Sequence, residues 1–306
     1  MWSVALRRSF ILIAAFSIFL AACAGTRGPV SQESYVVKDD IGTELTLPKE
    51  IHRAVSLAPS ITESIFAAGA GDRLVGVTTY CDFPEQAKQI QKVGDTLSPN
   101  AEAIIALQPD VVFVSQESQL EAFRNMLLQH GIPVFVVNQS DLEGVIADIR
   151  KFGELFGTRQ VANEEADRLE SRLKAVNQQI TGHPKPTVFV QVSKEPLFTI
   201  GKGSFITSMV SAAGAISATG DISTAYPKLS KETAYTLQPD IIVLSESEDN
   251  REPNDVFKNS PAVKNGQVFK IDAALLARPG PRSVDALEQL RSAIADRPDP
   301  GSSSKQ

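Results

Sequence analysis

The sequence of 306 residues contains only two cysteines, Cys23 and Cys81, and only three histidines. If Cys23 is lipidated, as argued below, a single thiol remains, which excludes an intramolecular disulfide and a cysteine-based zinc site. The histidines are far apart along the chain, and each is best explained as a solvated or capping side chain rather than a catalytic or metal-binding one. We therefore expect no metal site and no cofactor.

The sequence also lacks the motifs that most often carry enzymatic chemistry. No dinucleotide-binding GxGxxG loop is present, and Gly201–Ser204 (GKGS) lacks the upstream glycine that a P-loop requires. A GxSxG nucleophile elbow is missing as well. Because catalysis normally needs a convergent set of such groups, we expect that the protein is not an enzyme.

The chain has fewer basic than acidic side chains. The chain has 30 basic against 36 acidic side chains, which gives a formal net charge of −6. Removing the first 22 residues takes away two arginines and no acids, so that 28 basic side chains face 36 acidic ones and the charge becomes −8. Phosphate binding needs clustered Lys and Arg, so this balance argues against nucleic acid as a partner.

The first 22 residues read as a lipoprotein signal peptide. Arg7 and Arg8 precede an apolar run, Phe10–Leu20, that is too short to span a membrane comfortably. The run leads into small residues and then Cys23, which resembles the lipobox of bacterial lipoproteins; an ordinary secretory signal is the alternative. We expect an extracytoplasmic protein, in the periplasm or at the cell surface, that is anchored to the membrane through lipidated Cys23.

A short sequence occurs twice in the chain. The tetrapeptide Leu-Gln-Pro-Asp stands at 107–110 and again at 237–240, and Glu102 and Glu232 each lie five residues before a copy. A second matching pair, Ile-Thr leading into Ala-Ala-Gly-Ala, lies upstream of each copy. Two matches in the same order indicate two related α/β units, which suggests two lobes with a ligand-binding cleft between them.

Short apolar β-branched runs alternate with helical patterns, which predicts two Rossmann-like α/β lobes with mostly parallel sheets. We place a flexible tether at 23–34, an N-terminal lobe at 35–157, a C-terminal lobe at 186–296 and a flexible tail at 297–306. Apolar residues spaced four, three, four, three and four apart predict one long helix over 158–181, between the lobes. Such a helix would limit the lobes to small rocking, whereas an ordinary helix covering one sheet is the alternative.

Local signals mark the starts of two helices. Asn100 is expected to cap a helix that runs to Leu107. The segment 140–143 (SDLE) has the spacing of a capping box, which predicts that Ser140 caps the helix that follows.

Three segments are distinctive: 75–84 (VGVTTYCDFP), 226–232 (YPKLSKE) and 278–282 (RPGPR). Together with the repeats and the long helix, they resemble the helical-backbone substrate-binding proteins of ABC importers, and among these the cobalamin-binding members. The resemblance covers about Ser34 to Ala295. It implies a class III periplasmic binding protein that captures a corrinoid and delivers it to an ABC permease dimer with its ATPase. A ferric siderophore or haem on the same fold is the first alternative, and a ligand-sensing lipoprotein without transport is the second.

In that family the ligand contacts loops at the carboxyl ends of strands. A corrin is a partly apolar disc edged with amides, so tyrosines could stack on its faces while polar side chains bind its rim. We expect Cys81 to be a small buried side chain rather than a metal ligand. The resemblance implies these ligand-binding candidates: Pro59, Ser60, Tyr80, Asp82, Ser115 and Gln116 in the first lobe, and Lys202, Ser204, Tyr226, Arg278 and Arg282 in the second.

Glu102 and Glu232 are each expected in the first turn of a helix, where the helix dipole stabilises a carboxylate without any further role. In the family, one such glutamate per lobe pairs with arginines of the permease. The resemblance therefore implies that Glu102 and Glu232 dock the protein, as a monomer, onto a two-fold symmetric permease.

Overall fold

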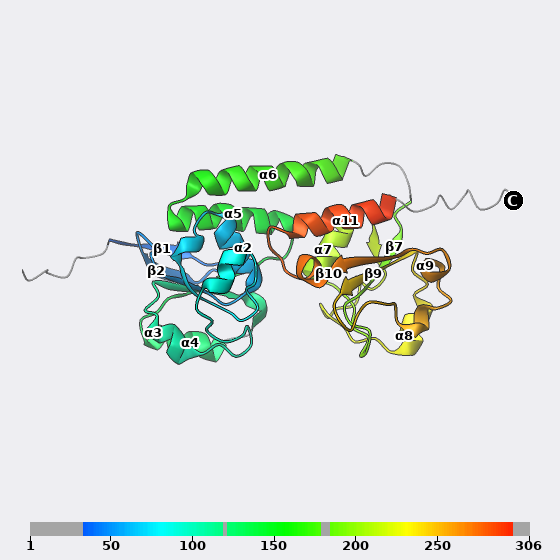
Figure 1. The fold of residues 1–306 in the computed structure, drawn as a ribbon, viewed down its shortest axis with the longest axis horizontal. Helices are drawn as coiled ribbons and strands as arrows, with labels where there is room; N and C mark the ends of the chain where they lie inside the picture. The colour runs from blue at the N-terminus through cyan, green and yellow to red at the C-terminus, as the bar shows by residue number, and fades with distance from the viewer. Residues whose placement is uncertain (1–32, 119–120, 179–183, 296–306) are drawn as a thin grey trace, which may run out of the picture. The chain divides into compact units, whose positions relative to one another are not determined.

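Each lobe is built on a four-stranded parallel sheet, and the two sheets share one topology (Figure 1). The computed structural model describes residues 33–118, 121–178 and 184–295. Strands run in the order β4-β3-β5-β6 in the N-terminal sheet and β8-β7-β9-β10 in the C-terminal sheet, so both follow the order 2-1-3-4. The strands are β3 (Ala54–Ser56), β4 (Leu74–Val77), β5 (Val111–Ser115), β6 (Val134–Val137), β7 (Thr187–Gln191), β8 (Ile216–Ser217), β9 (Ile241–Glu246) and β10 (Val268–Asp272).

One face of each sheet belongs to a single hydrophobic core that continues through both lobes. It includes Phe113 and Phe152 in the first lobe and Val190 and Leu287 in the second. Because helices cover both faces of such a sheet, its central strands are mostly apolar and carry buried residues on both faces: β5 and β9 are buried at every position except the last. The helices on this side are α2 (Pro59–Ala67), α5 (Leu142–Phe156), α6 (Arg159–Gln178), α7 (Phe205–Ala212) and α11 (Ser283–Ala295).

The long helix α6 packs against helices of both lobes. It contacts α2 and α5 of the N-terminal lobe and α11 of the C-terminal lobe (Figure 1). Its buried side chains include Ala162, Ala166 and Leu169, which follow the predicted spacing. The helix predicted over 158–181 is therefore confirmed as far as Gln178; residues 179–181 lie outside the described residues, as do 1–32, which contain Cys23, and the predicted tail.

The opposite face of each sheet is covered by a second, smaller set of helices. Ile104 and Leu127 cover it in the N-terminal lobe, and Ala234 and Ala262 do so in the C-terminal lobe. None of the helices in the described part of the chain is long and apolar enough to cross a bilayer. The helices on these faces are α3 (Ala101–Ala106), α4 (Glu121–Gln129), α8 (Lys231–Thr236) and α9 (Pro261–Lys264). Helix α10 (Ala273–Leu276) and the strands β1 (Ser34–Lys38) and β2 (Glu44–Pro48) instead add side chains to the shared core.

The repeated tetrapeptide forms the same local structure in both lobes. Gln108 and Gln238 have φ angles of 46° and 41°, and within the described ranges no other non-glycine residue has a positive φ. The carboxylate of Asp110 accepts two backbone N–H bonds, of 2.8 and 2.9 Å, from the residues just before β3. The carboxylate of Asp240 accepts the N–H and the hydroxyl of the first residue of β7, both at 2.8 Å. Each copy therefore fixes the first strand of its sheet beside the third.

One predicted helix start is confirmed and the other is wrong. Asn100 caps α3, because its side chain accepts a hydrogen bond of 3.0 Å from the N–H of Ala103. In segment 140–143 the cap of α5 is Asp141, not Ser140: Asp141 accepts a bond of 2.7 Å from the N–H of Gly144. Asp and Ser are about equally good caps, so spacing alone does not choose between adjacent ones.

Candidate functional site

The candidates of the first lobe all lie where strands of the sheet end, the edge at which parallel sheets bind ligands. Tyr80 is 58% exposed, whereas Ser60 is buried in α2. The set comprises Pro59 and Ser60 at the start of α2 after β3, Tyr80 and Asp82 in the loop after β4, and Ser115 and Gln116 at the end of β5.

The candidates of the second lobe occupy loops at the matching edge of its sheet. Lys202 is exposed in the turn before α7, and Ser204 is the buried N-cap of α7, where its hydroxyl accepts a 3.1 Å bond from the N–H of Thr207. Tyr226 is half-buried and packs against the shared core. Gly201 positions this region, since a Cβ there would overlap the carbonyl oxygen of Thr224. Arg278 and Arg282 lie in the loop between α10 and α11.

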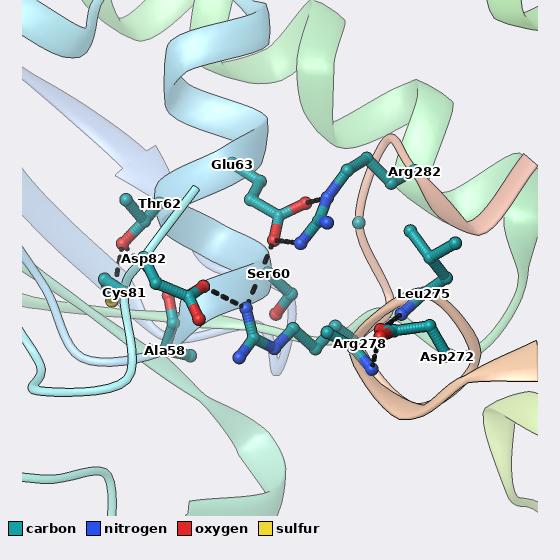
Figure 2. Close-up of polar contacts among 12 residues, drawn as sticks. Ala58, Ser60, Thr62, Glu63, Cys81, Asp82, Asp272, Leu275, Arg278 and Arg282 are labelled. Atoms are coloured by element: carbon teal, nitrogen blue, oxygen red, sulfur yellow. Dashed lines mark hydrogen bonds and ion pairs between the residues drawn. The ribbon is translucent and has the colours of Figure 1, made fainter. Parts of the chain in front are cut away.

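The loop at 278–282 reaches the other lobe through two arginines (Figure 2). Arg282 donates two hydrogen bonds to the carboxylate of Glu63 on α2, one of 2.9 Å from Nε and one of 2.6 Å from Nη2. Arg278 Nη1 lies 2.6 Å from Asp82 Oδ1 and 3.7 Å from Glu63 Oε1. We call Glu63, Asp82, Arg278 and Arg282 the arginine–carboxylate cluster.

The four members of the cluster differ in their access to solvent. The side chain of Glu63 is 3% exposed and those of both arginines are 21% exposed, but Asp82 is 56% exposed. A hydrogen bond from Arg278 lowers the pKa of Asp82, and a hydrogen bond to Glu63 raises the pKa of Arg282. The formal charges of the two carboxylates and two guanidinium groups cancel. A buried carboxylate is stable only with such partners, so Glu63 depends on the opposite lobe.

The arginines are held in place by their own surroundings. The hydroxyl of buried Ser283 donates to the carbonyl of Arg278 and accepts from the N–H of Gly280, at 2.8 and 3.1 Å. The guanidinium carbon of Arg282 lies 4.0 Å from the centre of the Phe83 ring, a cation–π contact. The loop therefore presents both arginines to the first lobe in a defined geometry.

Cys81, between two of the candidates, belongs to the shared core. It is 1% exposed, and its sulfur lies 3.1 Å from the hydroxyl oxygens of Thr62 and Thr78. Its expected burial is confirmed. Across the described part of the chain, no group of His, Cys, Asp and Glu side chains is arranged to hold a metal ion.

Further contacts join the second lobe to the first lobe and to the long helix. The hydroxyl of Ser208 on α7 donates to the carbonyl of Ser140, at 3.4 Å. Arg172 of α6 pairs with Asp285 and Glu288 of α11, at 2.6 and 2.7 Å. A pocket of about 550 Å³ lies between α2, α6 and the start of α11. Its wall includes two members of the cluster, Glu63 and Arg282.

Sequence reasoning missed Glu63 and Phe83 as site residues. Glu63 is the one acidic side chain in the otherwise apolar and hydroxyl-bearing helix α2, three residues after the candidate Ser60. That isolated charge was the available signal. Its partner Arg282 is 219 residues away, and nothing in the sequence connects the two.

The two docking candidates occupy equivalent places in the lobes. Glu102 and Glu232 are each the second residue of their helix, α3 or α8, and both are exposed. Ser230 caps α8 as Asn100 caps α3, with a bond of 3.1 Å from the N–H of Thr233. Hydrogen bonds from its own backbone and from Ser230 lower the pKa of Glu232.

Two α/β lobes with parallel sheets of one topology, packed on a shared long helix and carrying polar and aromatic side chains at their strand ends, define a bilobal solute-binding protein. A model of the family described as periplasmic binding protein matches residues 55–275, and the chain belongs to this family. The fold class and the family that the sequence predicts are both confirmed.

Three similar proteins show the range of the family. The chain is 32% identical over 268 residues to an uncharacterized ABC transporter substrate-binding lipoprotein, YvrC, of Bacillus subtilis (strain 168), covering 84% of each chain. Its fold matches the crystal structure of the periplasmic vitamin B12-binding protein of Vibrio cholerae, with a TM-score of 0.73, 28% identity and coverage of 81% of this chain and 98% of that one. It also matches a periplasmic haem-binding protein from Roseiflexus sp. RS-1, with a TM-score of 0.70, 26% identity and coverage of 80% and 98%.

Proposed function

We propose that this protein is the lipid-anchored substrate-binding component of an ABC importer, and that it carries a corrinoid. The observation that carries the proposal is the placement of the candidate side chains. They lie at the carboxyl ends of parallel strands in both lobes, and the 278–282 loop of one lobe contacts α2 of the other. This arrangement supports binding of a broad ligand in a cleft between the lobes.

The types of side chain fit a corrin disc. Tyr80 is largely exposed, so its ring is available to stack on an apolar macrocycle, and Tyr226 offers a second ring from the other lobe. Gln116 and Lys202 are exposed and supply donors for the amide carbonyls of the rim. The similarity to a vitamin B12-binding protein supports this choice of ligand, while the similarity to a haem-binding protein makes haem the second candidate.

Delivery to the permease follows from the same architecture. Helix α6 packs on both lobes, so we expect capture and release to require only small rocking motions. Glu102 and Glu232 present one carboxylate from each lobe and would pair with basic side chains of a two-fold symmetric permease. Lipidation of Cys23 would hold the protein at the membrane outside the cytoplasm, close to that partner.

Titration calorimetry on the mature chain, with Cys23 replaced to keep it soluble, tests the ligand. We expect cyanocobalamin to bind with a dissociation constant of about micromolar or lower. No binding of cyanocobalamin at tens of micromolar would contradict the corrinoid proposal. Tight binding of haemin or a ferric siderophore in its place would keep the transport role and change the cargo.

A further inference from the structure

We propose that the arginine–carboxylate cluster makes the site select ligands with an uncharged amide rim over ligands with a carboxylate rim, and that Asp82 sets this selection. The inference rests on the proposed function, in which a flat chelate binds between the lobes. It adds a rule about the charge of the ligand and names the residue responsible.

The first step concerns the guanidinium groups at the site, which are already engaged. Arg282 donates from Nε and Nη2 to Glu63, at 2.9 and 2.6 Å. Arg278 donates from Nη1 to Asp82, at 2.6 Å, and lies 3.7 Å from Glu63. Two carboxylates therefore match two guanidinium groups, and the cluster presents no net positive charge to a ligand.

The second step concerns the cost of binding an anionic rim. A haem presents the carboxylates of its propionate arms, and a carboxylate taken out of water needs a compensating cation. Such a ligand would have to displace Asp82 from Arg278. An amide rim carries no charge and needs only donors and acceptors; the carboxylate of Asp82 can itself accept an amide N–H.

The third step distinguishes the two carboxylates. Glu63 is 3% exposed and bound by both arginines, so it stays in place when a ligand binds. Asp82 is 56% exposed and accepts a hydrogen bond of 2.6 Å from Arg278. Asp82 is therefore the member whose removal uncovers a cation for the ligand while leaving the buried pair intact.

The test compares cyanocobalamin with its monocarboxylic acid derivatives, in which one rim propionamide is hydrolysed, so that shape is constant and charge alone changes. The proteins are the wild type, Asp82→Asn and the double variant Asp82→Asn/Arg278→Gln. Asp167→Asn serves as the matched control, because Asp167 is exposed and pairs with Arg150 at 2.6 Å on α5 and α6, outside the cluster. Thermal unfolding of each variant confirms that it is folded.

We expect the wild type and Asp167→Asn to bind the amide form about tenfold more tightly than the acid. Asp82→Asn should reduce that ratio by about tenfold, because Arg278 then pairs with the ligand carboxylate. The double variant should restore the preference for the amide form, since the uncovered cation is gone. Lys202 is the same in all variants, so its contribution to the affinity ratio cancels when the ratio of a variant is compared with the ratio of the wild type.

Equal binding of acid and amide by the wild type, or an unchanged ratio in Asp82→Asn, would overturn the inference and leave the corrinoid function standing. Failure of every corrinoid to bind would instead contradict the proposed cargo. The charge rule is then tested on the same variants with haemin and its dimethyl ester, in which the two rim carboxylates are uncharged. A wild-type preference for haemin over the ester would refute the rule.

Discussion

Asp148 on α5 is the clearest case of a single residue whose protonation affects the fold. Its side chain is almost fully buried, and this burial raises its pKa to about 6 despite a bond of 2.9 Å from the ammonium group of Lys151. Lys151 also pairs with Asp40, in the turn between β1 and β2. The three side chains tie that hairpin to α5.

The raised pKa of Asp148 predicts a pH dependence of stability. The folded state binds this proton more tightly than the unfolded chain, so the contribution to the free energy of unfolding is fully present below about pH 4 and is lost as the pH rises through about 6. The loss amounts to about 3 kcal/mol. In urea unfolding from pH 4 to 7, Asp148→Asn should lack this part of the dependence. Asp167→Asn, an exposed acid, should follow the wild type; parallel curves for Asp148→Asn and wild type would contradict the assignment.

At the same scale, the sequence predicts where the site residues lie but not what they contact. The position of Arg282 after the last strand is visible in the pattern of the chain. Its pairing with Glu63 depends on how two lobes meet, and a distance between residues so far apart in sequence has no local signature. Roles of the candidates toward a ligand stay predictions.

At the scale of elements, the contact between α5 and α6 depends on a glycine. A Cβ on Gly153 would overlap the Cβ of Ala162, so the two helices meet there at close range. Replacing a helical glycine by alanine usually stabilises a helix by up to about 1 kcal/mol. Here we expect Gly153→Ala to destabilise the protein by about 1–3 kcal/mol, measured by chemical unfolding.

A compensating substitution tests the cause of that effect. Ala162→Gly alone should cost about 1 kcal/mol through helix propensity. Combined with Gly153→Ala it should restore part of the lost stability, because the overlap is removed. Additive losses in the double variant would show that the close approach is not the reason.

The repeated tetrapeptide predicts that its two aspartates, Asp110 and Asp240, contribute equally to stability. Asp110→Ala and Asp240→Ala each remove the acceptor of two hydrogen bonds at the start of a lobe. We expect each to lower the free energy of unfolding by about 1–2 kcal/mol, and by similar amounts. Asp72→Ala, at a largely exposed position, should change it by less than about 0.5 kcal/mol. A large effect in one lobe alone would mean that the two copies differ in their structural role.

Element boundaries could be predicted where side chains determine them locally. The strand at 134–137 and the cap at Asn100 follow from β-branched runs and a capping side chain. The two-residue strand β8 was missed, because Ile216–Ser217 is too short for any periodicity and exists only through pairing with β7. The strand order itself is a tertiary property. In the sequence, only the repeated segments indicated that the two sheets would share one order.

At the scale of the whole molecule, the exposed Glu102 and Glu232 predict which surface docks onto the permease. Charge reversal by Glu102→Lys and Glu232→Lys should leave ligand affinity unchanged and reduce stimulation of the permease ATPase, most strongly in the double variant. Glu143→Lys is the matched control, because Glu143 is also the exposed second residue of its helix but lies on α5, on the opposite face of the sheet. Normal transport by the double variant would remove the docking role.

The single core that continues through both lobes limits how the protein can be recombined with its relatives. Side chains of α5, α6, α7 and α11 meet in it, so the lobes are not separable modules. A chimera joined near the middle of the chain would place two unmatched halves of one packed interior together, at the cost of mispacked side chains. The loops at the strand ends lie at the rim of that interior. Exchange of cargo between family members should therefore proceed by grafting those loops onto one intact scaffold.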